Sequence, residues 1–309
     1  MRKIAVYVVI GIIAVFVVVR IAGLKNNSGV KNVEPKKTPA TQMEIAFNNA
    51  VELQNTQPEQ AIVEFEKIVT EFPESLEAQK ALLAVADIQA KNADTEKERE
   101  TLQRLITAYP EGEIAAGAKQ RMWAKNLSAI FSRTATPDSI SYEVQPGDTL
   151  YKIAKNHNTN VDLIMKSNEL TQTLIKPGMK LKIINSKFSI IVNKSQNKLI
   201  LLADGKVIKE YPVGLGADNS TPVGKFKITN RIMNPVWYKT GAVVPAGSAD
   251  NILGTRWLGL SEPGYGIHGT VDMAPITEQK TQGCVRMLND DVDELFVIVP
   301  VGTEVAINE

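Results

Sequence analysis

The chain has 309 residues, a length that allows two or three domains. Hydrophobic residues make up 44% and charged residues 22% of it, which is typical of a folded protein and argues against a disordered one. The formal net charge of +1 gives no reason to expect nucleic acid as a partner. A single cysteine excludes an internal disulfide, and an unpaired thiol outside the cytoplasm would be a candidate for reactivity.

The chain begins with an apolar segment. Ile4 to Val19 is uncharged, and the apolar character resumes after Arg20 up to Leu24, which makes 21 residues in all. That is about the length of a membrane-spanning helix, whereas a signal-peptide core has roughly 7–15 residues. Residues 1–24 are therefore predicted to form an uncleaved transmembrane signal anchor, with a cleaved signal peptide as the alternative.

The charges around this segment do not by themselves indicate its orientation. Arg2 and Lys3 precede it, but five basic residues lie between positions 20 and 37, which would favour a cytoplasmic C-terminal part. Long domains cross the membrane largely regardless of such charges. We expect the C-terminal part to be extracytoplasmic because of the domains it contains. Residues 25–42 are polar, lack apolar periodicity and are predicted to be a flexible linker.

Residues 43–131 have the apolar spacing of helices, for example at Ala61, Ile62, Phe65, Ile68 and Val69. Within them, residues 67–74 (KIVTEFPE) align with residues 104–111 (RLITAYPE) at an offset of 37, close to the 34-residue period of tetratricopeptide repeats. Such an array of two or three helix pairs would offer a concave face to a protein partner. A plain helical spacer is the alternative.

Residues 141–184 are predicted to fold as strand, helix, helix and strand. The first strand is expected at 142–145, Thr149 is expected to cap the first helix, and the last strand is expected within 175–183. The segment resembles a LysM domain over its whole length. The matching positions are Tyr142, Val144, Gly147, Asp148, Thr149, Leu150, Ile153, Ala154, Asn168, Gly178 and Leu181.

The LysM resemblance implies binding to glycan that contains N-acetylglucosamine. It places the glycan-binding groove near Gly147, Asp148, Thr149 and Leu150 and the start of the second helix. We expect the module to hold the protein on glycan as a unit separate from the chemistry.

Residues 188–307 are rich in strand-forming residues. Asp204-Gly205 predicts a two-residue hairpin turn, residues 224–229 predict a strand, and residues 290–299 predict a helix packed on the sheet. The fold class is therefore multidomain α+β: a membrane helix, an all-α repeat region, a small βααβ module and a mainly-β C-terminal domain.

The chemistry is expected at the only cysteine, Cys284, and one of the two histidines, His268. A thiolate, not a thiol, is the nucleophile, so a cysteine needs a base, and His268 is the candidate. Gly283 allows close approach of the backbone, and N–H groups around Gly283 and Cys284 are natural oxyanion donors. Taken singly, each would more often be structural: a buried cysteine or a hydrogen-bonded histidine.

The two segments together, residues 266–270 (GIHGT) and 281–287 (TQGCVRM), resemble the active site of the L,D-transpeptidases of the bacterial cell wall, which have a YkuD-like catalytic domain. The separation of 16 residues between Cys284 and His268 fits that family. So do three further segments, at 220–226, 234–237 and 253–258. Two departures are Thr281, where the family usually has serine, and Gln282, where many members have a second histidine.

The resemblance implies a role for each site residue. Cys284 is the nucleophile and His268 the base, and the backbone carbonyl of Gly269 orients the histidine in place of a carboxylate. Arg286 is expected to pair with a substrate carboxylate, with a structural ion pair as its alternative. The remaining predicted substrate-binding residues are Thr281, Trp257 and Tyr265.

The predicted function is that of a membrane-anchored peptidoglycan L,D-transpeptidase, which contributes to cell-wall organisation and cell shape. A cysteine carboxypeptidase or amidase on the same stem peptides, or a non-enzymatic wall-binding scaffold, are the alternatives. We expect no metal or organic cofactor, because the sequence has no metal-ligand cluster and no glycine-rich phosphate loop.

Overall fold

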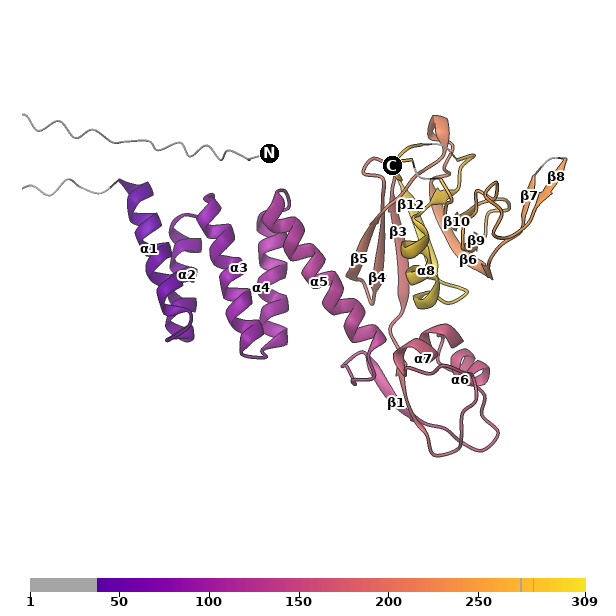
Figure 1. The fold of residues 1–309 in the computed structure, drawn as a ribbon, viewed down its shortest axis with the longest axis horizontal. Helices are drawn as coiled ribbons and strands as arrows, with labels where there is room; N and C mark the ends of the chain where they lie inside the picture. Colours follow the sequence, from indigo (N-terminus) through magenta and orange to yellow (C-terminus); the bar gives the residue numbers. More distant parts are fainter. Residues whose placement is uncertain (1–37, 240, 273, 280) are drawn as a thin grey trace, which may run out of the picture.

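The computed structural model describes residues 38–239, 241–272, 274–279 and 281–309. Along the chain it forms a row of helices, a small α/β module and a curled sheet with one helix against it (Figure 1). The predicted anchor at 1–24 and most of the predicted linker lie outside the described residues. Within the described ranges, no helix is long and apolar enough to cross a membrane.

Five helices form the N-terminal part, as the apolar spacing predicted. They begin at Pro39, four residues before the predicted start, and the side chain of Thr38 accepts a hydrogen bond from the Thr41 N–H at this end. The helices are α1 (Pro39–Leu53), α2 (Pro58–Glu71), α3 (Leu76–Lys91), α4 (Thr95–Ala108) and α5 (Glu113–Phe131).

The sequence echo at an offset of 37 corresponds to a repeated structural position. Helices α2 and α4 start 37 residues apart, and each ends at the residue before an aromatic-proline pair. The second of these aromatics, Tyr109, donates a hydrogen bond from its hydroxyl to the Pro73 carbonyl of the first pair. The two copies of the motif therefore contact each other directly.

The middle module has the expected order of strand, helix, helix and strand. Its elements are β1 (Ser139–Glu143), α6 (Leu150–Asn156), α7 (Val161–Ser167) and β2 (Lys180–Ile184), and the two strands pair antiparallel. The first strand begins and ends earlier than predicted, because the chain leaves the strand at Val144 for the turn before α6. Thr149 caps α6 as predicted, accepting a hydrogen bond from the Lys152 N–H at 3.2 Å.

The C-terminal part is a sheet of eight strands in the order β11-β10-β9-β6-β12-β3-β4-β5. The predicted hairpin turn is confirmed: Asp204 and Gly205 have φ angles of 49° and 78°, the left-handed conformation that a two-residue turn requires. The predicted helix at 290–299 is present as α8 (Asn289–Ile298). The strands are β3 (Phe188–Asn193), β4 (Lys198–Ala203), β5 (Lys206–Pro212), β6 (Gly224–Met233), β9 (Arg256–Leu260), β10 (Gly266–His268), β11 (Val285–Arg286) and β12 (Glu304–Asn308), with β7 (Trp237–Lys239) and β8 (Ala242–Val244) in a separate hairpin.

The eight-stranded sheet curls until its two ends meet. Gly214, just after β5 at one end, exchanges two backbone hydrogen bonds of 2.8 Å with Arg286 of β11 at the other end. Helix α8 packs against the curled sheet with Val292, Leu295 and Phe296 buried (Figure 1). The closure brings the segment after β5 against the strand that follows Cys284.

The middle module has a core cluster of its own, but it also packs against the C-terminal sheet. Leu163 of α7 and Ile184 of β2 belong to the same buried cluster as the sheet and α8, and so does Ile130 of α5. The side chain of Asn160 donates to the carbonyls of Val297 and Ile298 at the end of α8. The sequence did not predict this contact, because apolar periodicity shows that a face is buried but not against which element.

Candidate active site

Two adjacent strands of the sheet bring Cys284 and His268 together. Strands β10 and β11 run parallel, with Ile267 opposite Val285 and His268 opposite Arg286. Cys284 directly precedes Val285. This pairing places the segment that carries Cys284 beside β10, the strand that ends at His268.

The thiol of Cys284 is partly buried in this structure. Its Sγ donates a hydrogen bond to the Gly264 carbonyl at a distance of 3.6 Å. Burial raises the pKa of the Cys284 thiol, and a backbone hydrogen bond from Gly266 opposes that rise only in part. The resting group is therefore a thiol, and it needs a base before it can act as a nucleophile.

His268 is buried, with 2% of its surface exposed. Its Nδ1 donates to the Gly269 carbonyl at 2.6 Å, which is the contact expected of the residue that orients the base. Burial lowers the pKa of His268 from 6.5 to about 4; the positive charge of Arg286 also lowers it, while the backbone carbonyls of Gly269 and Ile252 oppose the change. The ring is neutral near pH 7 and can accept a proton.

The loop before Cys284 depends on a glycine at position 283. Gly283 has a φ of +121°, and a Cβ atom there would overlap the ring of Tyr265 and lie 3.0 Å from the Ser220 carbonyl oxygen. Its N–H donates to Thr281 Oγ1 at 3.2 Å, and the Thr281 hydroxyl donates to the Cys284 carbonyl at 2.6 Å. The Thr281 hydroxyl therefore shapes the loop that carries the cysteine.

Arg286 is 4% exposed and its guanidinium is engaged within the protein. Nη1 pairs with Asp272 at 3.1 Å, and Nη2 donates to the carbonyls of Pro275, Ile276 and Glu278 at 3.1–3.4 Å. These contacts match the structural ion pair that the sequence left open as an alternative. Pairing of Arg286 with a substrate carboxylate stays a prediction.

The two predicted aromatic substrate contacts flank the cysteine and the histidine. Trp257 of β9 stacks on the His268 ring with centroids 6.1 Å apart and planes 20° from parallel. Tyr265 packs against the core and next to Gly283. Both are partly exposed, so each has a surface left for a ligand, and their substrate contacts stay predictions.

The predicted glycan contacts lie in the middle module, in the turn between β1 and α6. Asp148 accepts hydrogen bonds from the Tyr142 hydroxyl and the Gln145 N–H, both at 2.8 Å, and these bonds lower the pKa of its carboxyl group. Leu150 is buried in the core of the module. These residues shape the turn, and glycan binding by them stays a prediction.

The sequence analysis missed Asn289, the first residue of α8. Its Oδ1 accepts hydrogen bonds from the N–H groups of Thr255 and Thr270, at 3.2 and 3.1 Å. A Cβ atom at Gly269 would overlap this oxygen, so it packs directly against the residue that orients His268. The sequence does show an asparagine followed by two aspartates at the predicted start of this helix. That pattern indicates a helix N-terminus, but it does not indicate which loops the asparagine side chain contacts.

Among the described residues, no group of three or more histidine, cysteine, aspartate or glutamate side chains could hold a metal ion.

Three family models match the chain. The L,D-transpeptidase catalytic domain matches residues 187–307, the LysM domain residues 142–183 and a tetratricopeptide repeat residues 80–112. The first of these covers every strand of the large sheet, and the second covers the middle module from within β1 to within β2.

Curated relatives agree with the first model. Putative L,D-transpeptidase YqjB of Bacillus subtilis is 41% identical over 126 residues, which are 39% of this chain and 70% of that protein. Putative L,D-transpeptidase YkuD of the same organism is 34% identical over 176 residues, 55% of this chain and 99% of that protein. A solved L,D-transpeptidase from Mycobacterium smegmatis aligns at 16% identity over 43% of this chain and 64% of its own, with a TM-score of 0.34, too low to support an argument. On the strength of the sequence relatives, the chain belongs to the L,D-transpeptidase family.

Proposed function

We propose that this enzyme is a peptidoglycan L,D-transpeptidase in which Cys284 is the nucleophile and His268 the base. The observation that supports the proposal is the pairing of β10, which ends at His268, with β11, which directly follows Cys284. Both residues lie within the part of the chain that matches the catalytic domain.

The first half of the reaction is acylation of Cys284. His268 takes the proton of the Cys284 thiol, which breaks the hydrogen bond between Sγ and the Gly264 carbonyl. The sulfur then attacks the carbonyl carbon on the L-centre of a third-position diamino acid in the stem peptide. The hydrogen bond from Nδ1 to Gly269 keeps one ring nitrogen protonated and leaves the other as the acceptor. Terminal D-Ala then leaves with the proton from His268, and a thioester remains.

The oxyanion that develops on the substrate carbonyl needs a hydrogen-bond donor. The local hydrogen bonds indicate which backbone N–H group is free to donate. The Gly283 N–H already donates to Thr281 Oγ1, so we assign the role to the N–H of Cys284 itself. In the second half of the reaction, an amine of another stem attacks the thioester. Its proton passes to His268, the C–S bond breaks, and the Cys284 sulfur leaves and takes that proton back as a thiol. The product is a cross-link between two third-position residues.

The other regions of the chain have proposed roles that would place the catalytic domain at the cell wall. We propose that residues 1–24 anchor the protein in the membrane with the C-terminal part extracytoplasmic, and that the LysM domain binds glycan through the turn at 147–150. We further propose that the five-helix array offers a surface to a protein partner. The match of residues 80–112 to a tetratricopeptide repeat supports this last assignment.

The test is incubation of the purified protein with a disaccharide tetrapeptide, with products identified by mass spectrometry. The wild type is expected to release D-Ala and form cross-linked dimers, and Cys284→Ala is expected to form none while keeping the thermal stability of the wild type. A strained β-lactam should add once to the wild type and not to Cys284→Ala, because it offers the thiol a reactive carbonyl.

Dimers from Cys284→Ala would disprove the assigned nucleophile. Release of D-Ala without dimers, at saturating acceptor, would instead indicate a carboxypeptidase, in which water replaces the amine.

A further inference from the structure

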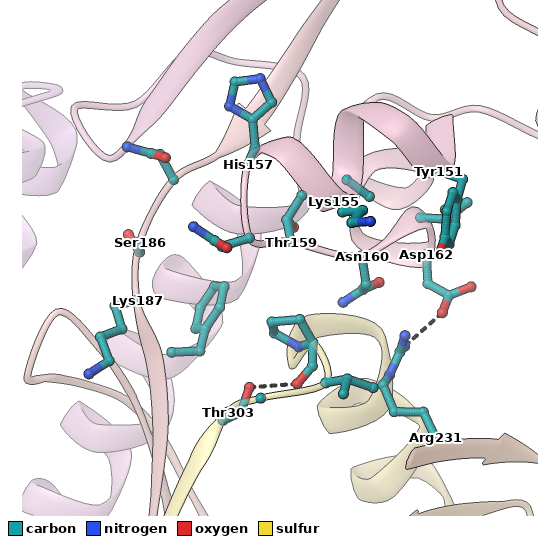
Figure 2. A pocket seen from close by; sticks show the side chains of 18 residues that line it. Tyr151, Lys155, His157, Thr159, Asn160, Asp162, Ser186, Lys187, Arg231 and Thr303 are labelled. Atoms are coloured by element: carbon teal, nitrogen blue, oxygen red, sulfur yellow. Dashed lines mark hydrogen bonds and ion pairs between the residues drawn. The ribbon is translucent and has the colours of Figure 1, made fainter. Parts of the chain in front are cut away.

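A cleft of about 730 Å³ lies between the LysM domain and the catalytic domain. One wall is the end of α6 and the start of α7, and the other is the connecting segment at 185–188 together with the turn at 300–303. Figure 2 shows Tyr151 and Lys155 on the first wall, Ser186, Lys187 and Thr303 on the second, and Arg231 next to Asp162. The volume is within the range of about 300–1,000 Å³ that is usual for sites of small ligands.

The two walls are held in a fixed relation by polar contacts at the base of the cleft. Asn160 Nδ2 donates to the Val297 carbonyl at 3.0 Å, and Arg231 pairs with Asp162 at 2.7 Å across the domain boundary (Figure 2). Arg231 also donates to the Phe296 carbonyl and lies over its ring. The cleft is therefore formed before any ligand enters, which reduces the ordering cost of binding.

The lining chemistry is that of a saccharide site. Tyr151 is 70% exposed, so an apolar ring face is available for stacking on the C–H face of a sugar. Asn158 and Asn185 offer amide donors and acceptors for hydroxyl groups, and Lys155 offers a donor for an acetamido carbonyl. The acidic side chain at the cleft, Asp162, is already paired with Arg231 and does not repel such a ligand.

The cleft shares the start of α7 with the predicted glycan groove, but it faces the catalytic domain and is distinct from the active site. None of the residues of the 147–150 turn lines it, and none of its lining residues belongs to β9, β10 or β11. We propose that this cleft is a second glycan subsite, which binds an N-acetylated sugar unit of a peptidoglycan strand and fixes that strand relative to the catalytic domain. The inference rests on the proposed function, because it takes its ligand class from the same polymer.

The test is hydrogen–deuterium exchange of the full chain, followed by mass spectrometry, with and without a tetrasaccharide of N-acetylglucosamine. Saturating tetrasaccharide is expected to slow exchange in 185–188 and 300–304, on the catalytic side of the cleft. Val301 lines the cleft and is 57% exposed, so Val301→Trp should fill the space without unfolding the turn. It should raise the tetrasaccharide concentration for half-maximal protection of 300–304 by about tenfold or more.

Val63→Trp is the matched control, because Val63 is 54% exposed and lies in α2, far along the chain from the cleft. It should leave the protection unchanged. Protection confined to the 147–150 turn, or protection of 300–304 that survives in Val301→Trp, would overturn the proposal. So would protection by a sugar-free stem peptide alone.

This experiment measures binding and does not require turnover. A wrong assignment of Cys284 and His268 would appear in the dimer assay and leave the exchange result intact. If the tetrasaccharide did not protect the cleft, the glycan subsite would be ruled out, and the transpeptidase proposal would still stand.

Discussion

Burial of His268 has a consequence for stability as well as for proton transfer. The folded-state pKa of about 4 is below the ordinary 6.5, so the unfolded chain binds the proton more tightly. The stabilisation from a neutral His268 is fully present above pH 6.5 and is lost as the pH falls from 6.5 towards 4. The difference of about 2.5 pH units corresponds to about 3 kcal/mol.

The first prediction is that urea unfolding will show this loss and that His268→Asn will not. The variant removes the titrating ring but keeps a polar side chain, and all other ionisable groups, including His157, stay the same. We expect the wild type to lose about 3 kcal/mol more than His268→Asn between pH 7 and pH 4. Equal losses in the two proteins would show that His268 is not held neutral by burial.

Gly283 carries the second prediction at this scale. Gly283→Ala would place a Cβ atom against the Tyr265 ring in a backbone conformation that alanine rarely adopts, so the loop must shift and move Cys284 with it. A displacement of about 1 Å can cost about a hundredfold in rate, and we expect at least that loss of transpeptidation.

Gly247→Ala is its control, because Gly247 also has a positive φ, +75°, but nothing lies within 4 Å of an added Cβ. Gly247→Ala should introduce similar backbone strain but should not reduce the rate of transpeptidation. If both variants keep their activity, the close packing at Gly283 does not position the nucleophile.

At the scale of elements, the start of α8 positions the loop that holds His268. Asn289→Ala removes the acceptor that the Thr255 and Thr270 N–H groups share, beside Gly269. We expect a fall of kcat with little change of KM, because Asn289 acts through His268 and not on the substrate. Asp290→Ala, at the exposed neighbouring position, is the control and should leave both constants nearly unchanged. A change confined to KM would instead place Asn289 at the substrate.

The same scale shows which features the sequence could predict. The Asp204-Gly205 turn, the Thr149 cap and the end of the helical region at Phe131 depend on local residue types, and each was predicted correctly, whereas the first helix begins four residues earlier than predicted. The closure of the sheet between Gly214 and Arg286 was not, because two isolated residues of ordinary type carry no signal of pairing 72 positions apart. For the same reason, the buried contacts of Arg286 with residues 272–278 could not be distinguished from a role in binding substrate.

At the scale of the whole molecule, buried polar side chains tie the three folded regions together. Asn126 of α5 donates to the carbonyls of Val207 and Ile208 in β5, and Lys182 of β2 donates to the carbonyls of Ala129 and Ser132 near the end of α5. Each would leave buried groups without partners if the regions separated, which makes separation costly. A deletion of the LysM domain would therefore expose the core of the catalytic domain, and it cannot test glycan tethering alone.

Two neighbouring residues of α7 allow a sharper test of this shared core. Leu163 and Ile164 are each 1% exposed, but Leu163 belongs to the core cluster of the catalytic domain and Ile164 to the cluster within the LysM domain. Leu163→Ala is expected to cost about 2–5 kcal/mol and to speed hydrogen exchange in α8, because the cavity opens in the cluster that α7 shares with α8. Ile164→Ala should cost a similar amount but speed exchange mainly in β1 and β2. If Leu163→Ala left exchange in α8 unchanged, the LysM domain would be an independent tether after all, as the sequence alone had led us to expect.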